Sequence, residues 1–407
     1  MSELLEKRLG LQNFEDLIYP IEPATFEEIH WEQKTLLVQR EDSGYYKSLF
    51  SNDKVDEILD LHRPKGNSIR VVKNQEPLPS KKYENQDGSL NLNQLYASYA
   101  DGYTIVINEI ERFWKPLRNL CQNIQGSFSH KTVANMYLTP KNQKALMPHY
   151  DTHDVYVLQI HGKKHWKLYD ADYQTPILNS FQPIFQREQL KNEKEITLHA
   201  GDLMYIPRGI PHEAVTTDES SLHLTIGVYP TQWMDVLMKS VYHLAHTNLE
   251  LRKALPLGFM SSKENTENFT SELAFKLKQL LETVTQKADA QASLQFIAEE
   301  FRTKQKPMGD GHFAHLDELG QLDLETTLVH RKNMNCKVQS IGTISRIIYP
   351  GNVIKGPVHI APCLDFIAEH KNGFQISEIP LLNDANKIKL SKRLVRGGLL
   401  KVADTTV

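Results

Sequence analysis

The sequence predicts an α+β protein in which a β sandwich or barrel precedes a helical segment and a second α+β unit. Short β-branched and aromatic runs separated by Gly and Pro recur between residues 132 and 228, and this spacing is typical of sandwiches and barrels. Between residues 233 and 301, apolar side chains repeat at helical spacing instead. The stretch TKQKPMGDG at 303–311 indicates a linker before the remaining residues.

Before the β-rich segment, the pattern changes repeatedly between helix and strand. Apolar residues at helical spacing predict short helices, β-branched runs predict strands, and a stretch rich in Lys, Pro, Asn and Gln predicts a loop. We expect helices at residues 26–32, 51–61 and 113–121, strands at 68–72 and 103–107, and a loop at 73–93.

The β-rich segment itself predicts six strands. We expect them at residues 133–138, 154–160, 165–169, 195–198, 203–206 and 222–229. Gly162 is expected to separate the second strand from the third, and Pro207 with Gly209 to end the fifth. The turn signals around Pro207 are expected to present His212 at the mouth of a barrel.

The remaining residues predict helices first and a mixed unit afterwards. We expect helices at 233–249, 272–285 and 290–301, a strand at 341–349, a helix at 385–395 and a strand at 399–402. The predicted domains are therefore 1–232, 233–306 and 307–407. Because apolar helix faces outside a barrel need a partner to bury them, the middle segment is a candidate for association.

Composition excludes several classes of protein. The 407-residue chain has 40% hydrophobic and 24% charged residues, and its net charge of −3 gives no overall attraction to nucleic acid or an anionic membrane. We expect neither a transmembrane helix nor a secretory signal, because long apolar runs do not occur. Cys121, Cys336 and Cys363 are odd in number and far apart, which argues against a disulfide scaffold and fits a cytoplasmic protein.

The clearest chemical pattern is the segment MPHYD at 147–151. Residues two apart on an extended chain share a side, so His149 and Asp151 can present a nitrogen and an oxygen donor together. His212, in PRGIPH at 207–212, could add a second imidazole. Two His and one carboxylate form the facial triad of non-heme Fe(II) oxygenases, which leaves metal positions open for other ligands.

A His-x-Asp triplet alone is weak evidence for a metal site. The chain has 17 His and a second such triplet at His315 and Asp317, which we interpret as surface. For a lone His149, an ordinary histidine without a metal is the more common case. The surrounding motifs favour a functional metal site over an ordinary histidine. They are NMYLTP at 135–140, LQIHGKKHW at 158–166, and Gly-Asp at 201–202 before PRGIPH.

Together these segments resemble the JmjC-type ribosomal oxygenases. This cupin-like family of Fe(II)/2-oxoglutarate-dependent protein hydroxylases includes the bacterial ribosomal-protein arginine hydroxylase and the nucleolar histidine hydroxylases. The resemblance covers nearly the whole chain. It implies a double-stranded β-helix (cupin/JmjC barrel), then a helical dimerisation segment, then a winged-helix-like C-terminal domain.

The resemblance also implies roles for single residues. His149, Asp151 and His212 match the family's Fe(II) ligands. Lys164 matches the basic residue that pairs with the distal carboxylate of 2-oxoglutarate, and a buried carboxylate does need a cationic hydrogen-bonding partner.

Three further positions match residues of the family's active site. Asn135 and Thr225 match positions that hydrogen-bond the cosubstrate, and Tyr137 matches the catalytic-site residue beside the target side chain. The chain also departs from its relatives. The aliphatic run at 105–107 stands where the nucleolar enzymes carry a basic contact, and the loop at 151–154 is closer to the bacterial pattern.

The implied function is hydroxylation of an Arg- or His-class side chain of a ribosomal protein, with O2 consumed and succinate and CO2 released. Two alternatives stay open: the same chemistry on another peptide, such as a natural-product precursor, or a non-catalytic cupin scaffold that binds ribosome or RNA. Demethylation starts from the same C–H abstraction. The family implies a homodimer. The basic helix at 385–395 could contact phosphates, although such a charge run is usually a solvated face.

Overall fold

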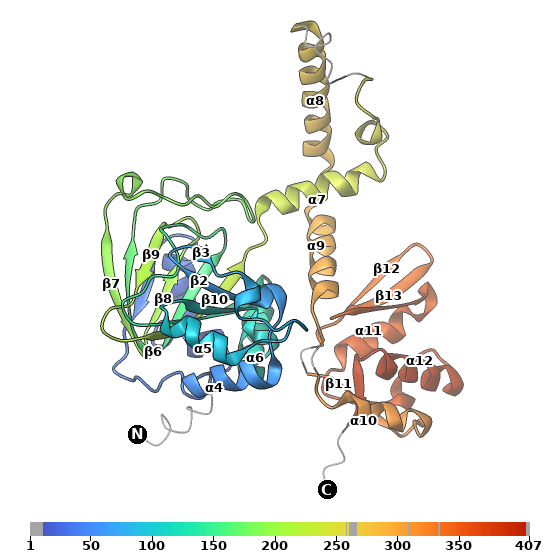
Figure 1. The fold of residues 1–407 in the computed structure, drawn as a ribbon. Coiled ribbons are helices and arrows are strands. Elements are labelled where there is room, and N and C mark those ends of the chain that lie inside the picture. The colour runs from blue at the N-terminus through green and yellow to red at the C-terminus, as the bar shows by residue number, and fades with distance from the viewer. Residues whose placement is uncertain (1–10, 258, 260–266, 308, 333, 404–407) are drawn as a thin grey trace. The chain divides into compact units, whose positions relative to one another are not determined.

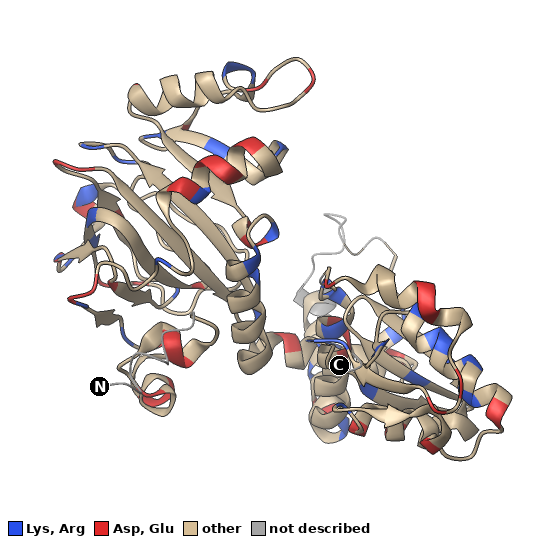
Figure 2. Ribbon diagram, turned by 90° about the horizontal axis from the view of Figure 1, so that it is seen from below, with Lys and Arg blue, Asp and Glu red and all other residues tan. Residues whose placement is uncertain are grey.

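The computed structural model describes residues 11–257, 259, 267–307, 309–332 and 334–403. The chain divides into two compact units, Met1–Thr231 and Gln232–Val407 (Figure 1), and each unit has its own hydrophobic core. Acidic and basic residues are interspersed along the ribbon of both units (Figure 2). In the described ranges, the helices lack the combination of length and apolar character that a membrane span requires.

One ten-stranded antiparallel sheet organises the first unit. Its order is β1-β8-β6-β10-β5-β4-β2-β3, and β7 and β9 also pair with β6. The strands are β1 (Leu36–Val38), β2 (Ile69–Lys73), β3 (Glu76–Pro77), β4 (Thr104–Asn108), β5 (Lys131–Thr139), β6 (Asp154–Leu168), β7 (Lys194–His199), β8 (Leu203–Ile206), β9 (His212–Val215) and β10 (Ser221–Tyr229).

Helices pack against one face of this sheet (Figure 1). Leu17 and Ile124 from the helices are buried in the same core as Met136 and Leu158 from the strands. Side chains alternate across a strand, so the neighbours of these strand residues face the opposite side. The helices are α2 (Phe14–Ile18), α3 (Pro23–Thr25), α4 (Asn52–Glu57), α5 (Leu92–Ala100) and α6 (Lys115–Phe128), with π-helical turns η1 (Phe26–His30) and η2 (Ile58–His62).

The sequence of α6 explains why it forms and which face it buries. Leu117, Leu120, Cys121 and Ile124 follow the i, i+3, i+4, i+7 spacing, and all four are buried. Pro116 lies in the first turn, where its missing N–H costs no hydrogen bond. Each of the three buried aliphatic side chains contributes roughly 2 kcal/mol relative to exposure, so packing rather than intrinsic propensity holds this helix.

The long strand β6 corrects the prediction of two strands separated by Gly162. Its 15 residues are continuous. The first half pairs with β8 and β10, and the second half pairs with β7 and β9. Gly162 has a φ of +65°, and an added Cβ would lie 1.9 Å from the carbonyl oxygen of Ser220. The glycine therefore lets the strand bend between two sets of partners without ending it.

The bend brings the two halves of the sheet around a second apolar cluster. Val157 from the first half of β6 and Trp166 from its second half share this cluster with Leu198 and Met204. β9 was not predicted, because its four residues follow a Pro- and Gly-rich turn. His212 is the first residue of β9 rather than part of that turn.

Among the described residues, the second unit begins with the helices α7, α8 and α9 and continues with a segment of mixed helices and strands. The strand expected at 341–349 is formed over Ile344–Tyr349 (β13), whereas Ile341 ends the preceding strand β12 (Lys337–Ile341), because the turn at Gly342 reverses the chain. Its helices are α7 (Trp233–Ala245), α8 (Glu267–Lys287), α9 (Ala290–Lys304), α10 (His312–Asp317), α11 (Ala361–Glu369) and α12 (Asp384–Arg396). Its strands are β11 (Thr327–His330), β12 (Lys337–Ile341), β13 (Ile344–Tyr349), β14 (Asn352–Pro357), β15 (Phe374–Gln375) and β16 (Leu400–Val402), in two sheets of order β15-β11-β16 and β12-β13-β14.

Replacing Gly162 with Ala is expected to lower the free energy of unfolding by about 2–4 kcal/mol, because left-handed strain adds to the overlap with the Ser220 carbonyl. Urea denaturation followed by circular dichroism measures the change. Gly126→Ala is the matched control, since Gly126 lies in α6 with no atom within 4 Å of an added Cβ; this change should stabilise the chain by about 0.5–1 kcal/mol. Equal stability of Gly162→Ala and wild type would contradict the bend.

Candidate metal centre and its cavity

Two histidines and an aspartate converge between the loop that precedes β6 and the start of β9. One potential ligand atom from each of His149, Asp151 and His212 lies within 4.8 Å of the others. Asp151 Oδ2 is 3.6 Å from His212 Nε2, and the two imidazole centroids are 4.7 Å apart. Backbone pairing holds this arrangement, because His149 N donates to His212 O at 3.1 Å and His212 N donates to His149 O at 2.8 Å.

Hydrogen bonds to the backbone set the orientation of both rings. His149 Nδ1 lies 2.8 Å from the carbonyl oxygen of Met147, and His212 Nδ1 lies 3.0 Å from that of Ile210. A carbonyl oxygen accepts only, so each Nδ1 carries the hydrogen and each Nε2 keeps its lone pair. Gln182 Nε2 approaches Asp151 Oδ1 at 3.5 Å, which leaves Oδ2 as the oxygen nearest the imidazoles.

The protonation states of these groups suit a metal ligand set. Burial, together with the neighbouring His149, lowers the pKa of His212 to about 4. Burial alone would raise the pKa of Asp151, but the nearby imidazoles of His153, His149 and His212 outweigh it, and the pKa is lowered. At neutral pH the site therefore presents a neutral imidazole at His212 beside a carboxylate, the forms that bind metals.

These three residues line a cavity of about 280 Å³. This volume lies near the lower limit of small-molecule sites, which is roughly 300 Å³. The walls combine apolar residues, among them Val157, Trp166 and Ile206, with polar and charged ones. Such a cavity has room for a small organic acid.

Lys164 brings a positive charge into this cavity. It is 3% exposed, and its Nζ donates to Thr139 Oγ1 at 3.1 Å. Within the part of the chain that the structure describes, no ion pair to a carboxylate is found for it. Burial accordingly lowers the pKa of Lys164 to about 7. A buried ammonium without an anion is unfavourable, so this site is suited to a bound carboxylate.

Of the other predicted site residues, some line the cavity and some do not. Tyr137 and Thr225 line the cavity. Asn135 is absent from the lining; its Oδ1 accepts a hydrogen bond from Glu109 N at 3.1 Å. His315 and Asp317 of the second His-x-Asp triplet belong to α10 in the second unit, where Asp317 is exposed, as expected for a surface position, and His315 is partly buried.

Several lining residues were not found from the sequence. His223 is buried and stacks on Tyr137 with ring centroids 4.8 Å apart. Alternation along β10 was the missed signal, because His223 lies two residues from Thr225 and therefore on the same face. Arg70, Gln75 and Gln182 also line the cavity. They come from the sheet edge and from loops, where no local pattern indicates an approach to the site.

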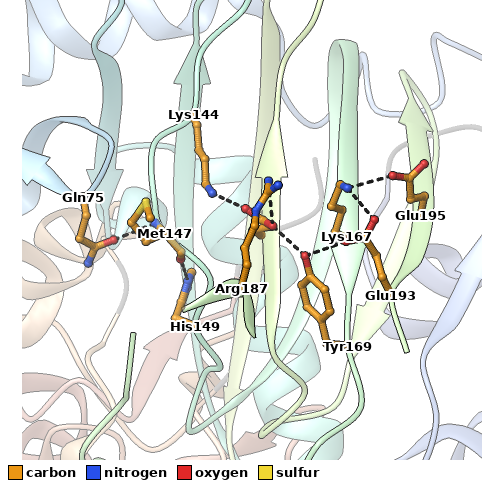
Figure 3. Close-up of polar contacts among 10 residues, drawn as sticks. Gln75, Lys144, Met147, His149, Lys167, Tyr169, Arg187, Glu193 and Glu195 are labelled. Carbon is orange, nitrogen blue, oxygen red and sulfur yellow. Dashed lines mark hydrogen bonds and ion pairs between the residues drawn. The ribbon is translucent and has the colours of Figure 1, made fainter. Parts of the chain in front are cut away.

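A buried carboxylate next to His212 ties the surrounding segments together, and its partners Lys144, Tyr169 and Arg187 are labelled in Figure 3. Glu213 is 5% exposed and forms an ion pair with Lys144 from the loop that bears His149. Tyr169 Oη donates to Glu213 Oε1 at 2.7 Å, and Arg187 lies 3.7 Å from the same oxygen. Glu213 thus links β9, the end of β6 and the two loops beside the cavity.

Comparison with known proteins matches residues 109–236 to the JmjC domain. The chain is 31% identical over 312 residues to the bifunctional lysine-specific demethylase and histidyl-hydroxylase NO66 of Aedes aegypti, covering 72% of this chain and 48% of that protein. It is 31% identical over 278 residues to ribosomal oxygenase 2 of Mus musculus, covering 66% and 59%. The chain therefore spans about half the length of these two curated relatives.

The chain therefore contains a JmjC domain and is similar in sequence to the ribosomal oxygenases. Among solved structures, E. coli YcfD matches with a TM-score of 0.51 at 16% identity, and the match covers 94% of this chain and 98% of that chain. At this identity the match shows the fold. It confirms the mixed helix-and-sheet architecture with a cupin-type JmjC barrel that the sequence predicted.

Lys164→Met is expected to stabilise the metal-free chain, most strongly at low pH. The folded chain lowers the pKa of Lys164 from 10.5 to about 7. The resulting penalty is therefore complete below pH 7 and disappears as the pH rises through 10.5. The gain from Lys164→Met should be larger at pH 6.5 than at pH 9 by on the order of 2 kcal/mol, measured by urea denaturation.

Lys163→Met serves as the control for this prediction. Lys163 is the sequence neighbour, and its Nζ lies 2.9 Å from Asp218 Oδ1. Because that lysine already has a carboxylate partner, its replacement should give no gain that grows at low pH. The same pH-dependent gain in both variants would show that burial of Lys164 is not its cause.

Proposed function

We propose that this chain is an Fe(II)/2-oxoglutarate-dependent oxygenase that hydroxylates an Arg- or His-class side chain of a ribosomal protein. The observation that carries the proposal is the convergence of His149, Asp151 and His212 beside Lys164, a buried cation. The printed names of the relatives, histidyl-hydroxylase and ribosomal oxygenase, support both the reaction class and the substrate class.

The residues present fit the metal and the cosubstrate. Two imidazole nitrogens and one carboxylate oxygen would hold Fe(II) and leave positions for 2-oxoglutarate and O2. The bound iron supplies O2 activation coupled to oxidative decarboxylation of 2-oxoglutarate to succinate and CO2, and transfer of one oxygen atom to a substrate C–H bond. Lys164 would bind the distal carboxylate of 2-oxoglutarate, and Thr225, which also lines the cavity, would hydrogen-bond the cosubstrate.

The substrate side chain would enter beside Tyr137. Tyr137 and His223 form a stacked wall of the cavity, and burial raises the pKa of Tyr137 to about 12, so its hydroxyl stays protonated and can donate a hydrogen bond. A flat aromatic wall with a polar edge is suited to a planar polar group such as a guanidinium or an imidazole.

An alternative substrate for the same chemistry is the peptide precursor of a natural product. The cytoplasmic location of the protein stays a prediction.

Anaerobic titration with Fe(II) and 2-oxoglutarate tests the metal and cosubstrate. The wild-type chain should develop a visible metal-to-ligand charge-transfer band and, once O2 is admitted, release succinate. His212→Ala should lose the band, and its succinate release should fall to background, because two remaining ligands hold iron poorly. His161→Ala, an exposed histidine on β6, is the control and should behave as wild type. A band of wild-type intensity in His212→Ala would refute the assigned ligand set.

Intact-mass spectrometry of purified ribosomal proteins tests the substrate. After incubation with the chain, Fe(II), 2-oxoglutarate and O2, one protein should gain roughly 16 Da, the mass of one oxygen atom. Fragmentation then assigns the gain to an Arg or His residue. No gain in any ribosomal protein, combined with normal charge-transfer absorption, would exclude the ribosomal substrate and favour the peptide alternative.

We further propose that residues 233–306 form a homodimerisation domain and residues 307–407 a winged-helix-like domain. The α7 helix packs against α8 and α9, yet it exposes a row of large apolar side chains: Trp233, Met234, Leu237, Met238 and Tyr242. A contiguous apolar surface of this kind favours association, and two copies would meet through the same surface. Contact of RNA with the basic residues of α12 stays a prediction.

Trp233→Glu combined with Leu237→Glu is expected to convert a dimer into a monomer. The two side chains are 83% and 63% exposed, so the change should leave the fold of the single chain intact while placing charge in the interface. Light scattering coupled to size exclusion measures the mass. Leu61→Glu, at a 69% exposed leucine of the first unit, is the control and should leave the mass unchanged. A wild-type chain that elutes as a monomer contradicts the dimer.

A further inference from the structure

Gln75 occupies a backbone conformation that its residue type does not favour. Asn74 and Gln75 form the two-residue turn between β2 and β3, since Lys73 pairs with Glu76. Both have positive φ, 51° and 71°. Turns with this conformation favour Asn-Gly, because glycine adopts positive φ without a steric cost. The chain therefore carries a side chain at the position where glycine would be less strained.

That side chain hydrogen-bonds the segment that holds His149. Gln75 Oε1 accepts from Met147 N at 3.1 Å, and the carbonyl oxygen of the same Met147 lies 2.8 Å from His149 Nδ1. Figure 3 shows this chain of contacts from the amide through the backbone to the imidazole. Since a backbone N–H can only donate, the contacting atom of the Gln75 amide is its oxygen.

The backbone conformation of Met147 is restricted. Pro148 follows it, and the residue before a proline is confined to extended conformations. Because the φ and ψ angles of Met147 are restricted in this way, a hydrogen bond that fixes the direction of its N–H also fixes the direction of its C=O. The carbonyl in turn binds Nδ1 of the His149 ring, which leaves Nε2 as the nitrogen available to a metal.

The turn is attached to the same loop without the Gln75 side chain. Asn74 N donates to Lys144 O at 2.9 Å, and Gln75 N donates to Ala145 O at 2.8 Å. Both bonds use backbone atoms, which glycine also has. The Gln75 side chain is therefore not needed to attach the turn, and its contact with Met147 N is a separate feature.

We propose that Gln75 is a positioning residue for the metal ligand His149, acting through the Met147 backbone. The inference deepens the proposed function, because it names a residue outside the ligand set that prepares one ligand before the metal arrives. Direct hydrogen-bond partners of metal-bound histidines typically change metal affinity 10- to 100-fold when removed. Gln75 acts one step further out, so a loss of about 10-fold is expected on that scale.

Three variants of the full-length chain test this role by Co(II) titration. Gln75→Gly removes the amide and relieves the strained φ, so Co(II) affinity should fall about 10-fold while the melting temperature stays the same or rises. Gln75→Glu keeps an acceptor oxygen and should restore the affinity to within about threefold of wild type. Glu76→Gln, at the exposed neighbouring position, is the control and should change neither quantity.

A second measurement uses the metal-free chain. Ring ¹⁵N chemical shifts of His149 should report a single Nδ1–H tautomer in wild type and in Gln75→Glu, and a mixture of tautomers in Gln75→Gly. Unchanged affinity and unchanged ring shifts in Gln75→Gly overturn the proposal. Melting temperatures that fall together in Gln75→Gly and Gln75→Glu would also overturn it, because the role would then be structural. A wild-type chain that binds no Co(II) counts against the proposed function, and the ring shifts still decide the role of Gln75.

Discussion

The candidate site depends on the reciprocal backbone pairing of His149 with His212. These two hydrogen bonds join the loop that bears the His-x-Asp pair to the first residue of β9. β9 in turn pairs with the second half of β6, and that half reaches its position because β6 bends at Gly162. The donors therefore converge through the hydrogen bonding of the sheet, so the fold can preorganise the site before a metal binds.

The local part of this arrangement could be predicted from the sequence. His149 and Asp151 are two residues apart before a strand, so their donors share a side whatever the remaining fold is. His212 required the linked motifs around it. Local pattern does not distinguish it from His223, which also enters the cavity but stacks on Tyr137. The difference arises from the register of β9 and β10 on β6, and register depends on pairing across the whole sheet.

Other features could not be predicted, because contacts between distant segments decide them. A glycine inside a β pattern usually signals a break in the strand. Gly162 nevertheless lies within a continuous strand, because β7 and β9 pair with the half of β6 that follows the glycine. Asn135 lies on β5 as expected, but the amide N–H of Glu109 occupies its side-chain oxygen. Gln75 belongs to a stretch expected to be loop, and its role appears only when the turn is seen against Met147.

Two features of the cavity cost the folded chain stability. Lys164 is buried without a carboxylate in the described structure, and Gln75 adopts a left-handed conformation. Such costs persist where the surrounding structure enforces them, and they concentrate at functional sites. A dicarboxylate cosubstrate would supply the anionic partner that Lys164 lacks in the fold. A metal would bind the imidazole of His149, whose orientation Gln75 helps to fix. Ligands that bind only the folded state stabilise it by mass action. The stability cost of Lys164 and Gln75 and the affinity of the site for its ligands therefore have the same physical origin.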